Sequence, residues 1–171
     1  MIITTDHGPV RELRLDRPPA NALTPELIVE LREALTRAPE EGVKAMVLSG
    51  RPGRFSGGLD VPYLLPLDRE GMEHLWRELY RLLQTLAASP VPIAAAITGH
   101  SPAGGAVLAM FCDYRVMAEG DFLIGLNEVH VGIVQQKLRS EPALPSSKFT
   151  SRISRRLRTP TTTCPTPTSL H

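Results

Sequence analysis

The chain has 171 residues, 42% of them apolar, and this length and composition predict one soluble globular domain with a core of its own. No apolar run approaches the length of a membrane-spanning helix, and the N-terminus lacks the basic and then apolar pattern of a signal peptide, so we expect a cytoplasmic protein with no membrane partner. The two cysteines, Cys112 and Cys164, have neither metal-ligand spacing nor a disulfide framework. We therefore expect no metal site and a buried Cys112.

The net charge of +1 conceals two parts of opposite sign. Residues 135–171 hold seven basic residues and one acid, so residues 1–134 keep 12 of the 19 basic and 17 of the 18 acidic residues. The same tail has five prolines, thirteen serines or threonines and no apolar periodicity, which is typical of disorder. The sequence therefore predicts a folded body over 1–134 and a disordered basic tail over 135–171. The basic run 152–158 lacks aromatic residues that could stack on bases, so we expect no nucleic-acid partner.

Strands and helices alternate in the first part of the body. Val10 to Asp16 alternates partly between apolar and charged residues and predicts a strand. Thr24 as N-cap and Pro25 at the first helical position predict a helix start, and Arg37-Ala38-Pro39 predicts its end. Lys44 to Ser49 is a second apolar strand. This alternation favours an α/β layered fold over a bundle or a sandwich.

A glycine-rich turn, Gly50 to Asp60, follows the second strand, and α/β proteins usually build their sites where such turns meet at a sheet edge. Arg69 to Leu86 then predicts a long helix with a leucine stripe. We expect Trp76 and Tyr80 to help cover that stripe. Arg51 and Arg54 flank the glycine turn, where they could meet phosphates or remain solvated.

The segment Ile93 to Asp113 predicts a strand, a turn over Gly99 to Pro102, and about three turns of helix that begin with Ala103-Gly104-Gly105. The first amides of a helix lack internal partners and attract a negatively polarised oxygen. A glycine pair costs about 1 kcal/mol per residue in a helix relative to alanine, so it indicates close approach by a ligand or by a neighbouring backbone. The residues alone leave both possibilities open.

Two short strands, Tyr114 to Ala118 and Phe122 to Ile124, precede a segment in which Glu128 stands among small and apolar neighbours. Such surroundings disfavour the charged carboxylate and raise its pKa toward the range of a general base. A salt-bridged or exposed glutamate remains the alternative. His100 and His130 are interpreted as hydrogen-bonded structural residues.

Three motifs carry a family resemblance: Phe55-Ser56-Gly57-Gly58-Leu59-Asp60, the Gly99 to Asp113 segment, and Gly125-Leu126-Asn127-Glu128. With them the chain resembles the crotonase (enoyl-CoA hydratase/isomerase) family over about residues 1–134, and within it the Δ3,Δ2-enoyl-CoA isomerases. The resemblance implies a layered ββα superhelix, here with the family's C-terminal part missing or replaced. It also implies a homo-oligomer in the family, which the lack of C-terminal helices would disfavour here.

The resemblance further implies an acyl-CoA thioester substrate, fatty acid metabolism, and no cofactor, because CoA is part of the substrate. The backbone amides of Leu59 and Gly104 would hold the thioester oxygen as an oxyanion hole. Glu128 would be the single acid–base, because Val107 occupies the position where hydratases of the family carry another glutamate. The residues expected to shape the loop or contact substrate are Ser56, Gly57, Gly58, Asp60, Val61 and Gly105.

Two functions from different classes remain. The first is an enoyl-CoA isomerase that uses Glu128, and the second is a non-catalytic acyl-CoA-binding remnant of the family. Gly99-His100-Ser101-Pro102-Ala103 is one residue short of a serine-hydrolase elbow and has no clear Asp and His partners. The glycines form neither a dinucleotide fingerprint nor a P-loop, so nucleotide binding is not expected.

Overall fold

A computed structural model of the chain describes residues 1–126. All described residues belong to one compact unit, Met1–Gln135. The tail predicted over 135–171, together with Glu128, His130 and Cys164, lies outside the described residues. No helix in the described part is long and apolar enough to span a membrane.

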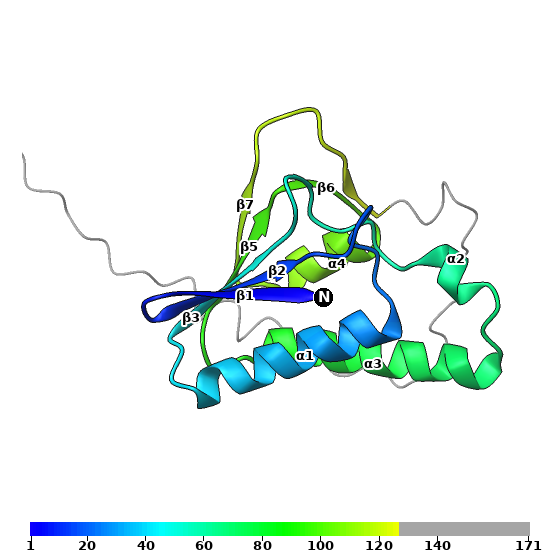
Figure 1. Ribbon diagram of the computed structural model, residues 1–171, viewed down its shortest axis with the longest axis horizontal. Coiled ribbons are helices and arrows are strands. Elements are labelled where there is room, and N and C mark those ends of the chain that lie inside the picture. The colour runs from blue at the N-terminus through cyan, green and yellow to red at the C-terminus, as the bar shows by residue number, and fades with distance from the viewer. Residues whose placement is uncertain (127–171) are drawn as a thin grey trace, which may run out of the picture. The chain divides into compact units, whose positions relative to one another are not determined.

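Two sheets form the framework (Figure 1). The larger sheet has the order β1-β2-β3-β5-β7, in which β1 and β2 form an antiparallel pair and the other neighbours are parallel. The smaller sheet has the parallel order β4-β6-β8. The strands of the larger sheet are Ile2–His7, Val10–Leu15, Ala45–Ser49, Ile93–Ile97 and Tyr114–Met117, and those of the smaller sheet are Gly53–Arg54, Gly99–Pro102 and Ile124–Gly125.

The same type of connection leads from the larger to the smaller sheet three times. Each of β3, β5 and β7 is followed along the chain by a strand of the smaller sheet, namely β4, β6 and β8. Thr98 alone separates β5 from β6. Strands β3 and β5 are parallel neighbours, so the connections that leave them emerge at the same edge of the larger sheet. The glycine-rich segments after these strands are thereby brought into neighbouring positions.

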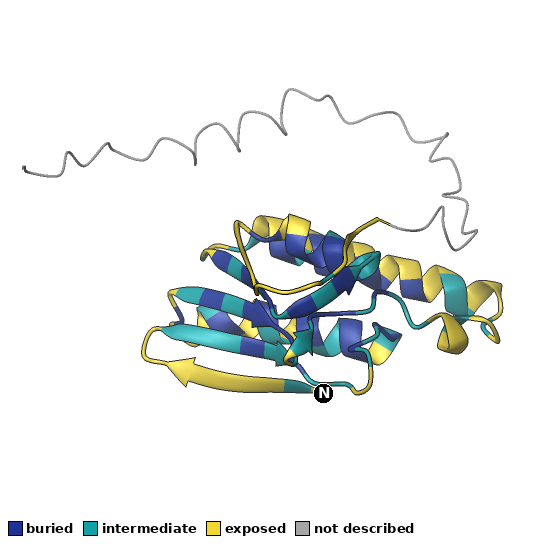
Figure 2. Cartoon of the chain, turned by 90° about the horizontal axis from the view of Figure 1, so that it is seen from above, coloured by how far each residue is buried: buried dark blue, intermediate teal, exposed yellow. Residues whose placement is uncertain are grey.

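Two long helices, α1 (Pro25–Glu40) and α3 (Arg69–Ala88), pack against each other below the larger sheet in Figure 1. Their buried faces share one core with the inward side chains of the strands, and Figure 2 shows that the opposite faces of the helices are exposed. Of two shorter helices, α2 (Val61–Leu64) follows the glycine-rich segment 50–60, and α4 (Gly104–Phe111) begins with a glycine pair.

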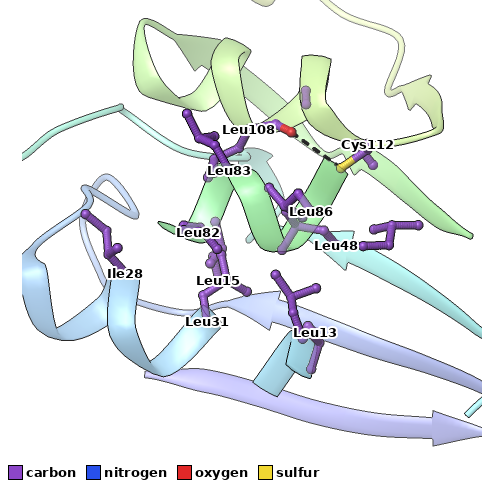
Figure 3. Packing of buried hydrophobic residues seen from close by; sticks show 14 of the residues in the cluster. Leu13, Leu15, Ile28, Leu31, Leu48, Leu82, Leu83, Leu86, Leu108 and Cys112 are labelled. Carbon is purple, nitrogen blue, oxygen red and sulfur yellow. Dashed lines mark hydrogen bonds between the residues drawn. The ribbon is translucent and has the colours of Figure 1, made fainter. Parts of the chain in front are cut away.

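The core is built mainly of leucine. Figure 3 shows Leu13, Leu15 and Leu48 from the strands close to Leu31 of α1 and Leu82 of α3. Each of these side chains is at most 1% exposed. Complete burial of a leucine is worth about 1.5–3 kcal/mol relative to leaving it in water, so this cluster fixes the sheet on the helix pair.

Several boundaries differ from those predicted. The structure has β1, β4 and α2, which the sequence did not indicate, and β6 occupies the predicted turn Gly99 to Pro102. Helix α1 continues to Glu40, with Pro39 inside its last turn, and α4 has 8 residues, fewer than three turns need. The layered α/β fold class itself is confirmed.

Trp76 and Tyr80 do not cover the leucine stripe of α3, so that prediction is wrong. The two residues are 42% and 49% exposed, and their ring centroids lie 6.2 Å apart. The physical reason is the helical period: each residue follows a stripe leucine by one position, which turns it about 100° away from the core. The buried stripe itself is formed by Leu75, Leu79, Leu82, Leu83 and Leu86.

Candidate functional site

Two backbone segments meet closely at the start of α4. Gly58 has φ +81°, and a Cβ atom added to it would lie 2.9 Å from the Gly104 nitrogen. A Cβ atom on Gly104 would lie 3.1 Å from the Gly58 Cα and 3.4 Å from the Leu59 nitrogen. Two glycines are therefore needed for a backbone-to-backbone approach, which was one of the two uses that the sequence left open.

The amide of Leu59 has a fixed direction. The Gly58 carbonyl accepts from the Leu23 N–H at 2.7 Å, and the Leu23 carbonyl accepts from the Asp60 N–H at 3.0 Å. In a trans peptide the N–H points opposite to the C=O, so the Leu59 N–H points away from Leu23. Within residues 1–126 this N–H has no hydrogen-bond acceptor.

The amide of Gly104 begins helix α4. Ala103, the N-cap, has φ 47° and makes no side-chain capping bond; its own N–H donates to the Gly125 carbonyl at 2.8 Å. The first N–H groups of a helix have no partner within it and carry the positive end of its dipole. The described part of the chain offers no acceptor to the Gly104 N–H, and both Gly104 and Leu59 are only half-buried.

Side chains of the 56–60 segment are engaged within the protein. Ser56 is fully buried, donates through its hydroxyl to the Asn21 carbonyl at 2.8 Å and accepts from the Gly58 N–H at 3.2 Å. Asp60 accepts from the Tyr63 N–H at the start of α2 and forms an ion pair with Arg17 at 2.7 Å. These contacts shape the loop, and any contact of Ser56 or Asp60 with substrate stays a prediction.

The remaining predicted residues lie around the same point. Gly105 is buried, and a Cβ atom there would lie 2.5 Å from the Ser56 carbonyl oxygen. The Gly57 N–H donates to the Ala20 carbonyl at 2.8 Å. Val61, the first residue of α2, is 43% exposed, and Val107 packs against the core from α4. The structure thus brings together the glycines and Ser56 of the prediction with Leu59 and Gly104, whereas Val61 is placed only as the exposed start of α2 and Glu128 lies outside the described residues.

Sequence reasoning missed Asn21 as part of this site. Asn21 is fully buried, and its side chain bonds the Arg54 and Phe55 carbonyls, directly before the glycine segment. The available signal was its setting: an asparagine between two alanines after a proline pair suits a left-handed backbone position. Because Asn21 bonds main-chain carbonyls, it belongs to no catalytic side-chain motif.

Nearby ionisable groups have structural roles. His100 accepts from the Leu123 N–H through Nδ1 at 3.1 Å and stacks edge-on against Phe122 with ring centres 5.3 Å apart. Burial raises the pKa of the Cys112 thiol to about 12, and its sulfur contacts the Leu108 carbonyl at 3.4 Å. Arg51 pairs with Asp16 at 3.2 Å. Residues 1–126 contain no cluster of His, Cys, Asp or Glu suited to a metal ion.

Two surface hollows lie away from the Gly58–Gly104 contact. Two open depressions of about 390 and 410 Å³ share His74 and are otherwise lined by residues of α1, α3 and their caps, many of them acidic. An acyl chain needs an apolar wall, and an anionic CoA would be repelled by carboxylates. We therefore place the candidate site at the two backbone donors.

Comparison with known proteins gives the same family as the motifs. The sequence matches the family described as Enoyl-CoA hydratase/isomerase over residues 5–144, ten residues beyond position 134. It is 35% identical over 138 residues to the mouse (Mus musculus) protein Enoyl-CoA delta isomerase 1, mitochondrial, covering 78% of this chain and 48% of that protein. It is 36% identical over 138 residues to a putative enoyl-CoA hydratase of Thermus thermophilus, covering 78% of this chain and 54% of that protein.

Comparison with solved structures points to the same family. The crystal structure of human mitochondrial delta3-delta2-enoyl-CoA isomerase superposes with a TM-score of 0.73 at 32% identity, covering 77% of this chain and 53% of that chain. The chain thus spans about half the length of the relatives that it matches. With most of its sequence matched by the family and a shared fold, the chain belongs to the enoyl-CoA hydratase/isomerase family.

Proposed function

We propose that this chain converts a 3-enoyl-CoA thioester to a 2-enoyl-CoA thioester, with the Leu59 and Gly104 amides as the oxyanion hole. The observation that carries this proposal is the pair of half-buried N–H groups that adjoin at the Gly58–Gly104 contact and have no acceptor within residues 1–126. Two neighbouring N–H groups that have no acceptor within residues 1–126 suit a polarised oxygen from a ligand.

The chemistry needs only a base and this oxygen site. A base removes a proton from C2, the electrons move into the C1 carbonyl to form an enolate, and the two N–H groups stabilise the negative oxygen. When the enolate collapses, the proton returns at C4 and the double bond lies between C2 and C3. Loss of one oxyanion donor typically costs about 3 kcal/mol of transition-state stabilisation. The step conserves atoms and electrons, so we propose no cofactor or metal beyond the CoA of the substrate.

Glu128 is the proposed base. It follows Gly125 by three residues, and the Gly125 carbonyl accepts from the Ala103 N–H next to Gly104. Glu128 itself lies outside the described residues, so its place beside the donors is part of the proposal. Val107 cannot exchange a proton, so the site would hold one acid and not a pair that could split water. This favours migration of a double bond over hydration.

A second candidate is binding of an acyl-CoA without turnover. The observation in its favour is that the chain matches only about half the length of its relatives, so their whole activity need not follow. The same two donors would hold a thioester oxygen without chemistry. The name of the mouse relative places that protein in mitochondria, so the cytoplasmic location expected here stays a prediction.

Absorbance of the conjugated 2-enoyl thioester separates the candidates. We expect the purified chain to isomerise a 3-enoyl-CoA and Glu128→Gln to lose activity by about 10²–10⁴-fold, the usual contribution of a general base. Glu119→Gln is the matched control because Glu119 is an exposed acid of the described part. Equal rates for the chain and Glu128→Gln would exclude Glu128 as the base. Acyl-CoA binding by calorimetry with no turnover would favour the second candidate.

A further inference from the structure

We propose that Asn21 is a positioning residue that holds the Leu59 N–H in line with the Gly104 N–H. The proposal rests on the function proposed above, since it concerns the oxyanion donors. Asn21 contacts no reacting atom; it acts through the segment 54–60. It lies between β2 and α1, more than thirty residues from that segment along the chain.

Every polar atom of the Asn21 side chain is used. Its amide nitrogen donates to the Phe55 carbonyl at 3.1 Å and to the Arg54 carbonyl at 3.2 Å, while its oxygen accepts from the Arg17 N–H at 2.9 Å. The side chain is completely buried. A neutral amide is the side chain that supplies two donors and one acceptor at this size, so neither Asp nor Leu can replace all three bonds.

The backbone of Asn21 is also unusual. Its φ of 49° lies in the left-handed region, which asparagine tolerates better than most residues. This turn aims the Asn21 carbonyl at the Ser56 hydroxyl, 2.8 Å away, and brings the Ala20 carbonyl to the Gly57 N–H at 2.8 Å. Residues 20 and 21 therefore bind both ends of the tripeptide 55–57.

The contacts continue directly to the donor. Ser56 accepts from the Gly58 N–H at 3.2 Å, and the Gly58 carbonyl accepts from the Leu23 N–H at 2.7 Å. That carbonyl and the Leu59 N–H belong to one rigid peptide plane. Rotation of the plane would turn the Leu59 N–H away from Gly104, and a misplacement of about 1 Å in a catalytic site can reduce the rate about 10²-fold.

The test uses Asn21→Gly, which keeps the left-handed backbone available and removes only the side chain. Its matched control is Glu78→Gln in α3, which removes the charge of a buried carboxylate that pairs with Arg32 and Arg81 outside the loop. Amide hydrogen exchange by NMR is measured for Gly57, Gly58 and Asp60 and for core amides. We expect exchange of these three amides to rise at least about tenfold in Asn21→Gly alone, because their acceptors lose support.

Kinetics supply a second readout. We expect kcat of Asn21→Gly to fall about 10- to 100-fold with KM changed less than about threefold, since the oxyanion donors act mainly in the transition state. In Asn21→Asp a carboxylate would face the Arg54 and Phe55 carbonyls, so its pKa is raised and protonation restores one donor. Its kcat relative to the original chain should therefore rise as the pH falls.

Either readout can overturn the proposal. Loop exchange in Asn21→Gly no faster than in Glu78→Gln, or an equal rise at every amide of the protein, would mean that Asn21 contributes only to general stability. A pH-independent rate ratio for Asn21→Asp would do the same. If the original chain neither binds nor turns over acyl-CoA, the proposed function fails, while the exchange rates still decide whether Asn21 holds the segment.

Discussion

Gly58 shows how one residue supports the site in two ways. Its φ of +81° is unfavourable for any residue with a Cβ atom, and the space beside it is filled by Gly104 and Ala103. The backbone conformation is similar at Gly42, with φ +87°, but there an added Cβ atom would have no atom of the described residues within 4 Å. Substitutions at the two glycines therefore distinguish the cost of backbone strain from the cost of a steric clash.

We predict that Gly58→Ala lowers the free energy of unfolding by more than Gly42→Ala does. Strain in the left-handed region costs about 1–2 kcal/mol in both variants, whereas the clash at 2.9 Å from the Gly104 nitrogen affects only the first. Urea unfolding measures both values. Equal destabilisation would contradict the close contact between the two segments.

Cys112 makes stability depend on alkaline pH. Because burial raises the pKa of this thiol to about 12 in the folded chain, the folded state keeps a proton that the unfolded state releases near pH 9. The stability contributed by the neutral thiol is complete below pH 9 and is lost as the pH rises toward 12. We predict that Cys112→Ala flattens the fall in unfolding free energy between pH 9 and pH 11, measured by urea unfolding. Parallel pH curves for the two proteins would contradict a buried thiol.

At the residue scale the sequence indicated the backbone N–H groups of Leu59 and Gly104, because the glycine segments that contain them carry family motifs. It indicated at most a left-handed turn at Asn21, and not that the side chain bonds the main-chain carbonyls at positions 54 and 55. Hydrogen bonds to main-chain atoms leave no side-chain pattern in the partner segment. Only the folded geometry connects the two.

At the scale of elements, the helices were the most predictable parts. Helix α3 begins at Arg69 as expected and ends at Ala88, two residues beyond the prediction, because the leucine stripe is strong and regular. The smaller sheet was not predicted. Its strands β4 and β6 are short and contain Gly and Pro, and they are stabilised by pairing with each other and with β8, which are non-local contacts that local propensity does not report.

The N-cap of α1 gives a test at this scale. The Thr24 hydroxyl accepts from the Leu27 N–H, while Thr36 in the same helix bonds only to the Arg32 carbonyl on an exposed surface. We predict that Thr24→Ala lowers the unfolding free energy by about 1 kcal/mol, whereas Thr36→Ala changes it by less than about 0.5 kcal/mol. Thermal or urea unfolding of the matched pair measures the difference. Equal values would mean that the cap does not stabilise the helix.

For the molecule as a whole, apolar surface gathers where both sheets stop. Strand β7 is last in the larger sheet and β8 is last in the smaller one, and in the described part neither has a second neighbouring strand. Figure 2 shows β7 and the chain beyond it as exposed. The large exposed apolar side chains there include Tyr114 at 67%, Val116 at 58% and Leu123 at 71%.

This surface should bind the dye ANS, which fluoresces on apolar protein surface. We predict that the double substitution Tyr114→Lys with Val116→Lys reduces the fluorescence, because both side chains are on β7 and a contiguous apolar patch is needed. Ile3→Lys on β1, at the other edge of the same sheet, is the matched control and should leave the signal unchanged. An equal fall in both variants would contradict a localised patch.

The family and the crotonase-like fold could be predicted for the whole molecule because three motifs occur in order, and the match over residues 5–144 confirms the family. The division into a body over 1–134 and a tail over 135–171 stays a prediction. Sequence motifs identify a site through residues that recur in a family. The contacts that support the site join residues far apart along the chain, and such pairs form no motif. The Leu23–Gly58 hydrogen bond illustrates this, since neither residue has a side chain that reveals it.

The proposed oxyanion hole can be observed directly by NMR on ¹⁵N-labelled protein titrated with hexanoyl-CoA, a saturated thioester that cannot isomerise. We predict that the Leu59 and Gly104 amide protons move downfield as the thioester oxygen binds, and that free CoA, which lacks this carbonyl, leaves both unchanged at saturation. Saturation with hexanoyl-CoA that leaves these two resonances in place would contradict the proposed site.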